Sequence, residues 1–346
     1  MAANPLPRRR GEGSTSGLSV AVVQWTHTLR MKNALLLARA QLRRSVSFDH
    51  HIVLQSCGDV QLGCDALLAE AQPLSENVTC FTATDMNRLV PATHRIANVA
   101  RGPHGGSAVH EVGAYRWCWY SCDAAYISWF VTTRPHSYDA FWFLEWDVTW
   151  TGDLAIILGA WNRADEAWNG GNASTGRTKL HHSAARKRGT VDHSPDMVCA
   201  DPRKASKAWP HLHSRNVSHL HFDQTFMCVT GVSRVSQRLM RAMVAYAKQE
   251  EAPMFCEMRL PSVCALNAAW CTMDTLFDDT HQQYLFADQT RWVGTYTARI
   301  SRADMESKMD RDQLWHGYQW RDDNRSRASF STRLYDMQLA ALNGTG

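Results

Sequence analysis

The fold is decided at residues 140–148, which read Ala140-Phe141-Trp142-Phe143-Leu144-Glu145-Trp146-Asp147-Val148. An apolar run that stops on acidic residues is typical of a buried strand in an α/β sheet. Glu145 and Asp147 stand at its carboxyl end, where ligands gather in sheets of this kind. Because side chains alternate along a strand, these two carboxylates point the same way. They can therefore share one hard cation or one polar ligand.

The rest of the chain predicts strands that alternate with helices, as in an α/β fold. Residues 18–25 are apolar and β-branched, and Met31, Leu35, Ala38 and Leu42 follow at helical spacing. The same criteria give a short set of further elements. Strands are expected at 51–55, 78–82 and 224–236, and helices at 115–129, 153–161 and 235–247.

The segment from Tyr138 to Gly152 resembles the metal- and nucleotide-binding strand of GT-A-type glycosyltransferases. Their DxD motif occurs here as Glu145-Trp146-Asp147. The aromatic strand, Val148 and the Thr151-Gly152 turn resemble more narrowly a group of nucleotide-diphospho-sugar transferase-like proteins. This resemblance implies a GT-A-like (Rossmann-like) mixed central sheet flanked by helices, with an acceptor-side lobe. The alternative is that the two acids only cap the helix that follows.

The resemblance also implies a function. It is that of a metal-dependent glycosyltransferase, which moves a sugar from a nucleotide-diphosphate donor to a hydroxyl of a glycan or protein acceptor. By this analogy Asp147 ligates Mn²⁺ or Mg²⁺, and Glu145 contacts the metal through a water molecule or contacts the ribose. Glu145 departs from the usual DxD, which leaves the division of roles open. A third ligand could be His281, Asp288 or His316.

A second matching patch lies at residues 256–264, where the related proteins carry an acidic residue and a proline. Glu257 is the acidic residue here, and it is the candidate catalytic base. In sugar transfer with inversion, a carboxylate takes the proton of the acceptor hydroxyl. The alternative is that Glu257 only pairs with Arg259 or Arg234 and holds the lobe together.

Composition and sequence order suggest one large enzyme domain with two flanking segments. Residues 1–17 are polar and are expected to form a flexible tail, and 18–300 form the catalytic domain. Within it, 169–215 are polar and are expected to form a loop or lid insert. Residues 301–346 are a C-terminal extension that packs on the domain or is partly flexible.

Overall composition narrows the classes of function. The chain has 346 residues, 45% hydrophobic and 20% charged, and no apolar run long enough for a membrane span. A net charge of +4 does not indicate a nucleic-acid partner. Two alternatives stay open, a non-catalytic nucleotide-sugar or glycan-binding protein of the same fold and, with less support, a glycoside hydrolase. A hydrolase needs two carboxylates on opposite sides of a bond, and two acids on one strand do not meet that need.

Sequons and cysteines favour a secretory compartment, the Golgi lumen in particular. N-glycosylation sequons include Asn77, Asn172, Asn216 and Asn343, and the chain has ten cysteines. Against this, the N-terminus shows no signal or anchor, so a cytoplasmic location is the alternative. No CxxC pair occurs, which gives a zinc site little support. Plausible disulfides are Cys57 with Cys64, or two of Cys256, Cys264 and Cys271.

Overall fold

The computed structural model describes residues 19–27, 29, 32–45, 48–56, 63–74, 77–91, 122–145, 148–159, 195–204, 225–249, 254, 256–275 and 313–315. The strands are β1 (Val20–Thr26), β2 (Phe48–Ser56), β3 (Val78–Thr82), β4 (Ala140–Leu144), β5 (Thr149–Thr151), β6 (Met197–Lys204), β7 (Phe226–Ser236), β8 (Met273–Thr275) and β9 (Gln313–Trp315). The helices are α1 (Lys32–Leu42), α2 (Cys64–Glu70), α3 (Ala83–Leu89), α6 (Cys122–Thr133), α8 (Gln237–Gln249) and α9 (Cys256–Leu266), with a 3₁₀ turn η1 (Gln72–Leu74).

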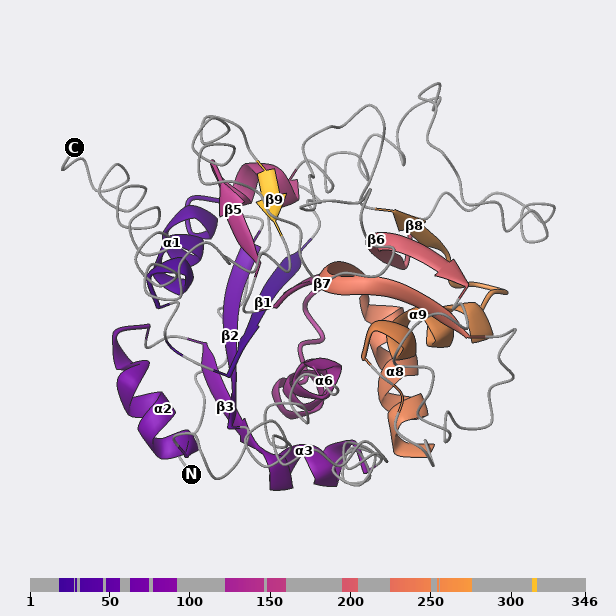
Figure 1. The fold of residues 1–346 in the computed structure, drawn as a ribbon, viewed down its shortest axis with the longest axis horizontal. Coiled ribbons are helices and arrows are strands. Elements are labelled where there is room, and N and C mark those ends of the chain that lie inside the picture. Colours follow the sequence, from indigo (N-terminus) through magenta and orange to yellow (C-terminus); the bar gives the residue numbers. More distant parts are fainter. Residues whose placement is uncertain are drawn as a thin grey trace, which may run out of the picture.

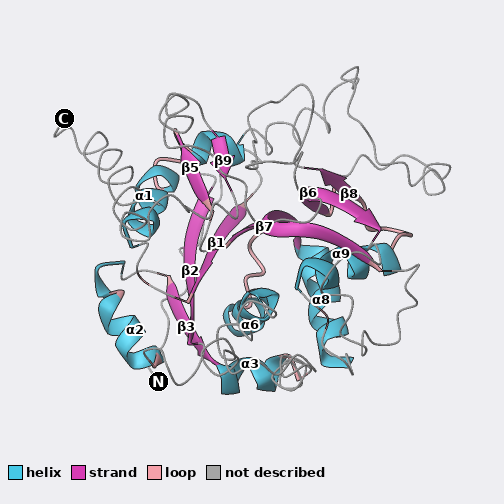
Figure 2. Cartoon of the chain, viewed as in Figure 1, coloured by secondary structure: helices cyan, strands magenta, loops and turns pink. Residues whose placement is uncertain are grey.

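The strands form a seven-stranded mixed sheet in the order β3-β2-β1-β4-β7-β6-β8 (Figure 1). Strands β1, β2, β3 and β4 run parallel to one another, whereas β7 runs antiparallel to both β4 and β6. Helices flank the sheet, as Figure 2 shows. The predicted fold class, an α/β fold with a mixed central sheet, is therefore confirmed.

Strand β1 is buried along its whole length because helices cover both faces of the sheet. Val22 lies in one apolar cluster with Leu37 of α1. Val23, the next residue, lies in a second cluster with Trp129 of α6. Alternation along the strand thus sends neighbouring residues into two cores, which explains why the sequence reads as an uninterrupted apolar run.

Sequence patterns located most of these elements. Strand β3 has the predicted bounds, and β1, β7 and α1 differ from prediction by one to two residues at an end. Strand β2 begins earlier than predicted, at Phe48. Residues 154–159 are helical inside the predicted 153–161. The predicted helix at 115–129 is described from Cys122 on, and it continues to Thr133.

The expected polar insert at 169–215 needs a correction. Residues 197–204 form β6, a strand inside the main sheet, so this part is neither loop nor lid. Its pairing with β7 shifts register twice between Cys199 and Arg203, beside Pro202. Proline cannot donate to a strand ladder, and bulges of this kind hide the alternating pattern that marks a strand. Residues 169–194 and 205–215 lie outside the described residues.

The chain ends were predicted as a tail and an extension. Residues 1–17 lie outside the described part of the chain. In the range 301–346 the structure describes β9, which pairs antiparallel with β5, the strand that follows Val148. None of the helices in the described residues is long and apolar enough to cross a membrane.

Three disulfides join the described elements, and they correct one predicted pair. Cys64 bonds to Cys80, not to Cys57, and this links α2 to β3. The pair Cys264–Cys271 lies within the predicted set of three and is confirmed. The third disulfide, Cys122–Cys256, spans 134 residues of sequence and was not predicted.

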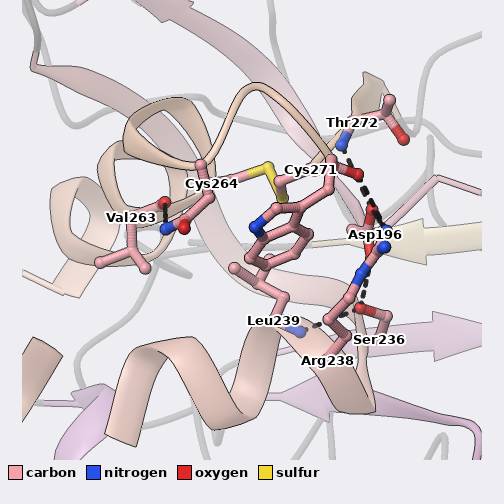
Figure 3. The surroundings of a disulfide bond; sticks show 10 residues. Asp196, Ser236, Arg238, Leu239, Val263, Cys264, Cys271 and Thr272 are labelled. Carbon is pink, nitrogen blue, oxygen red and sulfur yellow. Dashed lines mark hydrogen bonds and ion pairs between the residues drawn. A yellow bond between two sulfur atoms is a disulfide. The ribbon is translucent and has the colours of Figure 1, made fainter. Parts of the chain in front are cut away.

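A buried carboxylate, Asp196, holds the antiparallel half of the sheet together beside the Cys264–Cys271 disulfide (Figure 3). The Ser236 hydroxyl donates a hydrogen bond of 2.7 Å to it, and Arg238 forms an ion pair with it, also at 2.7 Å. The backbone N–H of Thr272 donates to the same carboxylate at 3.3 Å. Asp196 therefore ties together the start of β6, the end of β7, α8 and the turn before β8.

Two adjacent histidines in β2 are held neutral by the fold. Burial lowers the pKa of His50 to about 3, with smaller contributions from the charges of His51, Arg39 and Arg43. Burial also lowers the pKa of His51 to about 4, although the charge of Asp49 opposes this. The His51 ring lies 3.1 Å from the Tyr138 hydroxyl, which in turn donates to Asp49 at 2.9 Å.

This arrangement predicts acid destabilisation. In the unfolded chain a histidine takes up a proton near pH 6.5, whereas His50 and His51 stay neutral in the fold until about pH 3 to 4. The unfolded state therefore binds more protons as pH falls below 6.5, and stability is lost from there down to about pH 4. We expect the free energy of unfolding to fall by about 4 kcal/mol between pH 6.5 and 4.5 from this pair.

Urea unfolding of the wild type and of a His50→Gln/His51→Gln variant at both pH values checks this prediction. The variant should start less stable at pH 7 and lose less stability on acidification. An equal loss in both proteins would show that other groups cause the acid sensitivity.

Candidate functional site

The candidate site begins at Glu145, directly after β4. All five residues of β4 are buried, and Glu145 itself is 7% exposed. Its backbone N–H donates to the carbonyl of Gly231 in β7 at 2.8 Å, and its carbonyl accepts from Val148 at 3.1 Å. Glu145, one of the predicted acids, therefore lies at the carboxyl end of β4. Trp146 and Asp147 lie outside the described residues.

The Glu145 carboxylate lies beside the first residues of two helices. Cys122 begins α6 and Cys256 begins α9, and both sulfur atoms lie within 4.8 Å of a Glu145 carboxylate oxygen. Helix amino ends carry partial positive charge, which favours an anion nearby. The structure therefore places this carboxylate beside the amino ends of two helices.

Glu257 is the residue next to Cys256 and stands in the first turn of α9. It is partly exposed, whereas Cys256 and Met258 on either side are buried. The fold thus brings the backbone around the second predicted acid to the same end of the sheet as Glu145, although 112 positions separate the two acids in the sequence. The disulfide Cys122–Cys256 fixes this approach.

Cys122, Glu145 and Cys256 lie close enough together to hold a metal ion. The two sulfur atoms are bonded to each other, however, so neither is a thiolate ligand. Of this trio only the Glu145 carboxylate can donate to a cation. A cation at this position therefore meets oxygen donors, which suit Mg²⁺ or Mn²⁺ better than zinc.

A buried ion pair stands next to the disulfide. Arg259 of α9 is fully buried and donates to the Asp123 carboxylate of α6. Burial raises the pKa of Asp123, and the Arg259 guanidinium opposes that rise. Arg259, considered above as a partner of Glu257, thus joins the two helices whose first residues flank Glu145.

A small cavity of about 10 Å³ lies next to this disulfide and ion pair. It is lined by Cys122, Asp123 and Cys256 together with apolar side chains such as Phe143 and Met240. Such a volume holds about one water molecule. A cavity of this size is too small to admit a nucleotide.

Sequence reasoning missed the polar residues at the ends of β1, which pairs with β4, and of β2, which pairs with β1. Gln24 is paired with Leu144, so Trp25 and Thr26 extend level with and beyond Glu145. Four polar residues at this edge are buried. They are Thr26, the last residue of β1, His27, which follows it, and Gln55 and Ser56, the last two residues of β2. The sequence did contain a signal for these residues, since the apolar run of each strand is followed by polar residues at its last positions.

Gln41 of α1 holds the segment that follows the Glu-x-Asp motif, and it too was missed. Its buried side chain accepts hydrogen bonds from the Trp150 indole at 2.9 Å and from the Leu154 backbone at 3.1 Å. It donates to the carbonyl of Gly152 at 2.8 Å. Gly152 has φ of 77°, the left-handed region that favours glycine. One amide thus fixes the Thr-Gly turn of the sequence resemblance.

No family model matches the chain, and no curated protein matches its sequence. Among solved structures it is similar to the galactosyltransferase LgtC in complex with donor and acceptor sugar analogues, with a TM-score of 0.39, 9% identity, and 92% of this chain and 95% of that chain covered. Core-mannan synthase A of Aspergillus fumigatus in its Mn/GDP form gives a TM-score of 0.36 and 8% identity, over 78% of this chain and 75% of that one. The mannosyltransferase Ktr4p of S. cerevisiae gives 0.37 and 9%, over 76% and 71%.

These structures are GT-A-type glycosyltransferases, the family that the sequence resemblance named. Similarities this distant carry no argument about activity. The function is therefore argued from the site.

The ion pair between α6 and α9 leads to a stability prediction. In an Arg259→Met variant the buried Asp123 loses its partner, and we expect a loss of about 3–5 kcal/mol in the free energy of unfolding. The second substitution Asp123→Leu removes the buried carboxylate that has lost its partner, and it should restore most of the lost stability. Denaturant unfolding of the three proteins measures both effects. A single variant as stable as the wild type would mean that the pair does not hold the junction.

Proposed function

We propose that this chain is a metal-dependent glycosyltransferase, which moves a sugar from a nucleotide-diphosphate donor to a hydroxyl of a glycan or glycoprotein. One observation carries the proposal. A carboxylate at the end of a buried central strand, Glu145, lies against the amino end of the helix that carries a second, partly exposed acid, Glu257. Glu145 and Glu257, the acids of the two sequence patches that resemble sugar transferases, thus stand on elements that meet at one end of the sheet.

The donor half of the site consists of Glu145 and Asp147. Glu145 is the inner acid, held by β4 and by the two helix ends, and Asp147 follows two residues later. Together they would hold Mn²⁺ or Mg²⁺, and oxygen is the ligand type that these cations prefer. A cation held by these two carboxylates would neutralise charge on the departing diphosphate. The polar ends of β1 and β2 offer hydrogen bonds to the nucleotide along the same edge.

The acceptor half of the site centres on Glu257. Its carboxylate takes the proton from the acceptor hydroxyl while the oxygen of that hydroxyl attacks the sugar carbon. Its partial exposure allows contact with a substrate that arrives from solvent. Because the disulfide ties α9 to α6, Glu257 is held without a need to reorganise when the acceptor binds.

The three disulfides support an oxidising compartment, and we propose the secretory pathway, with the Golgi lumen as the place of action.

A non-catalytic binding protein of the same fold is the second candidate. The burial of Glu145 beside a disulfide and two helix ends favours it, because a carboxylate there also stabilises the fold by itself. A glycoside hydrolase has less support, since its two carboxylates must face the bond from opposite sides, whereas Glu145 and Asp147 stand two positions apart in the sequence.

Replacing Asp147 tests the donor half. We expect Asp147→Asn to lower the Mn²⁺-dependent affinity for UDP or GDP at least tenfold, about 1.4 kcal/mol, with an unchanged melting temperature in the absence of ligand. Asp65→Asn, which changes an exposed acid on α2, is the matched control. Calorimetric titration with and without Mn²⁺ measures both variants. An unaltered affinity in Asp147→Asn would remove this residue from the donor site.

Replacing Glu257 tests the acceptor half. A general base contributes about 10²–10⁴-fold to the rate, so Glu257→Gln should slow sugar transfer by that factor while nucleotide affinity stays the same. Glu70→Gln, at the exposed end of α2, is the control. Turnover is measured over a panel of nucleotide sugars with Mn²⁺. Full activity in the variant would contradict the role of Glu257, and a wild type that binds nucleotide without turnover would favour the binding protein.

A further inference from the structure

Asn77 precedes β3 and begins the sequence Asn77-Val78-Thr79, an N-glycosylation sequon whose middle residue is not proline. Of the sequons in this chain, it is the one that the described residues contain. Asn77 is exposed, and Thr79 is partly exposed. Asn77 stands directly before β3, and Thr79 is the second residue of that strand.

The position of β3 leaves room for a large modification. It is the first strand in the sheet order and pairs only with β2 among the described strands. The backbone carbonyl of Asn77 accepts from Ile52 at 2.9 Å, so the backbone is fixed while the side chain lies outside the ladder. Its amide donates to the His50 carbonyl at 3.3 Å, a long bond at an exposed place. β3 is parallel to β4 and three strands away from it, and Asn77 precedes the amino end of β3 whereas Glu145 follows the carboxyl end of β4, so a glycan is attached at the opposite edge of the sheet.

Asn77 has φ of 59°, in the left-handed region that asparagine tolerates better than most residues. This conformation explains why an asparagine stands before the strand. The left-handed backbone of Asn77 does not, however, explain why position 79 carries a hydroxyl. The exposed turn, the hydroxyl two residues on and the edge strand together form a complete acceptor site.

We propose that Asn77 carries an N-linked oligosaccharide. The amide nitrogen Nδ2 forms a bond to C1 of the reducing-end sugar of a lipid-diphosphate-linked oligosaccharide. The bond from C1 to the phosphate oxygen breaks, the lipid diphosphate leaves, and Nδ2 gives up one proton. The glycan also covers an open sheet edge, which otherwise favours pairing with other chains. This inference rests on the secretory compartment proposed above.

The test uses the full chain in eukaryotic cells, in one form as it is and in another behind a cleavable secretory leader. Thr79→Ala removes the hydroxyl and keeps the left-handed residue, and Thr79→Ser is the matched control that keeps the hydroxyl. Peptides released with N-glycosidase in ¹⁸O-water show by mass which asparagines carried a glycan. Chymotryptic and tryptic digests separate Asn77 from Asn172, Asn216, Asn324 and Asn343.

With the leader, we expect Asn77 to be modified in the wild type and in Thr79→Ser, and to be unmodified in Thr79→Ala. An Asn77 that stays unmodified in the leader form overturns the site. Modification with the leader but none without it leaves the site in place and contradicts the proposed compartment. Loss of glycan in Thr79→Ser as well as Thr79→Ala would also overturn it.

Discussion

The joint between α6 and α9 determines where the two candidate acids lie. It consists of the disulfide Cys122–Cys256 and the ion pair of Asp123 with Arg259. Closing a loop of 134 residues stabilises the fold by about 5 kcal/mol in the chain-entropy model. Without the joint, α9 would still be hydrogen-bonded to β7 through Ser262 and Phe226, but its first turn would lose its bonds to α6. With it, the start of α9 stays beside Glu145.

The ion pair contributes less to net stability than its burial suggests, because removing two charges from water is costly. Its effect is geometric, since the Arg259 guanidinium reaches the Asp123 carboxylate only in one relative position of α6 and α9. Apolar packing around Met240 and Phe143 tolerates small shifts, whereas a buried charge does not. The pair therefore selects one arrangement of the two helices, and this arrangement sets the place of Glu257.

Local patterns predicted β1 and β4 because these strands are largely apolar runs, and β3 and β7 because they are rich in valine and threonine. They failed at β6, where Pro202 and two register shifts break the pattern. Glu145 could be placed at a strand end from the sequence because an apolar run stops there. Its neighbours could not, because Cys122 and Cys256 approach it only through the packing of distant helices. The same holds for Gln41, whose three contacts lie more than 100 positions away.

The oxidised state of the joint also determines what Glu145 can bind. Two cysteines and a carboxylate within 4.8 Å of one another would, with free thiolates, form a soft site that suits zinc. The disulfide removes both sulfur ligands and leaves carboxylate oxygen. In the proposed transferase, the bond that holds α9 in place therefore also keeps the donor site selective for hard cations. Structure and cation preference at this site then depend on one covalent bond, which is stable only in an oxidising compartment.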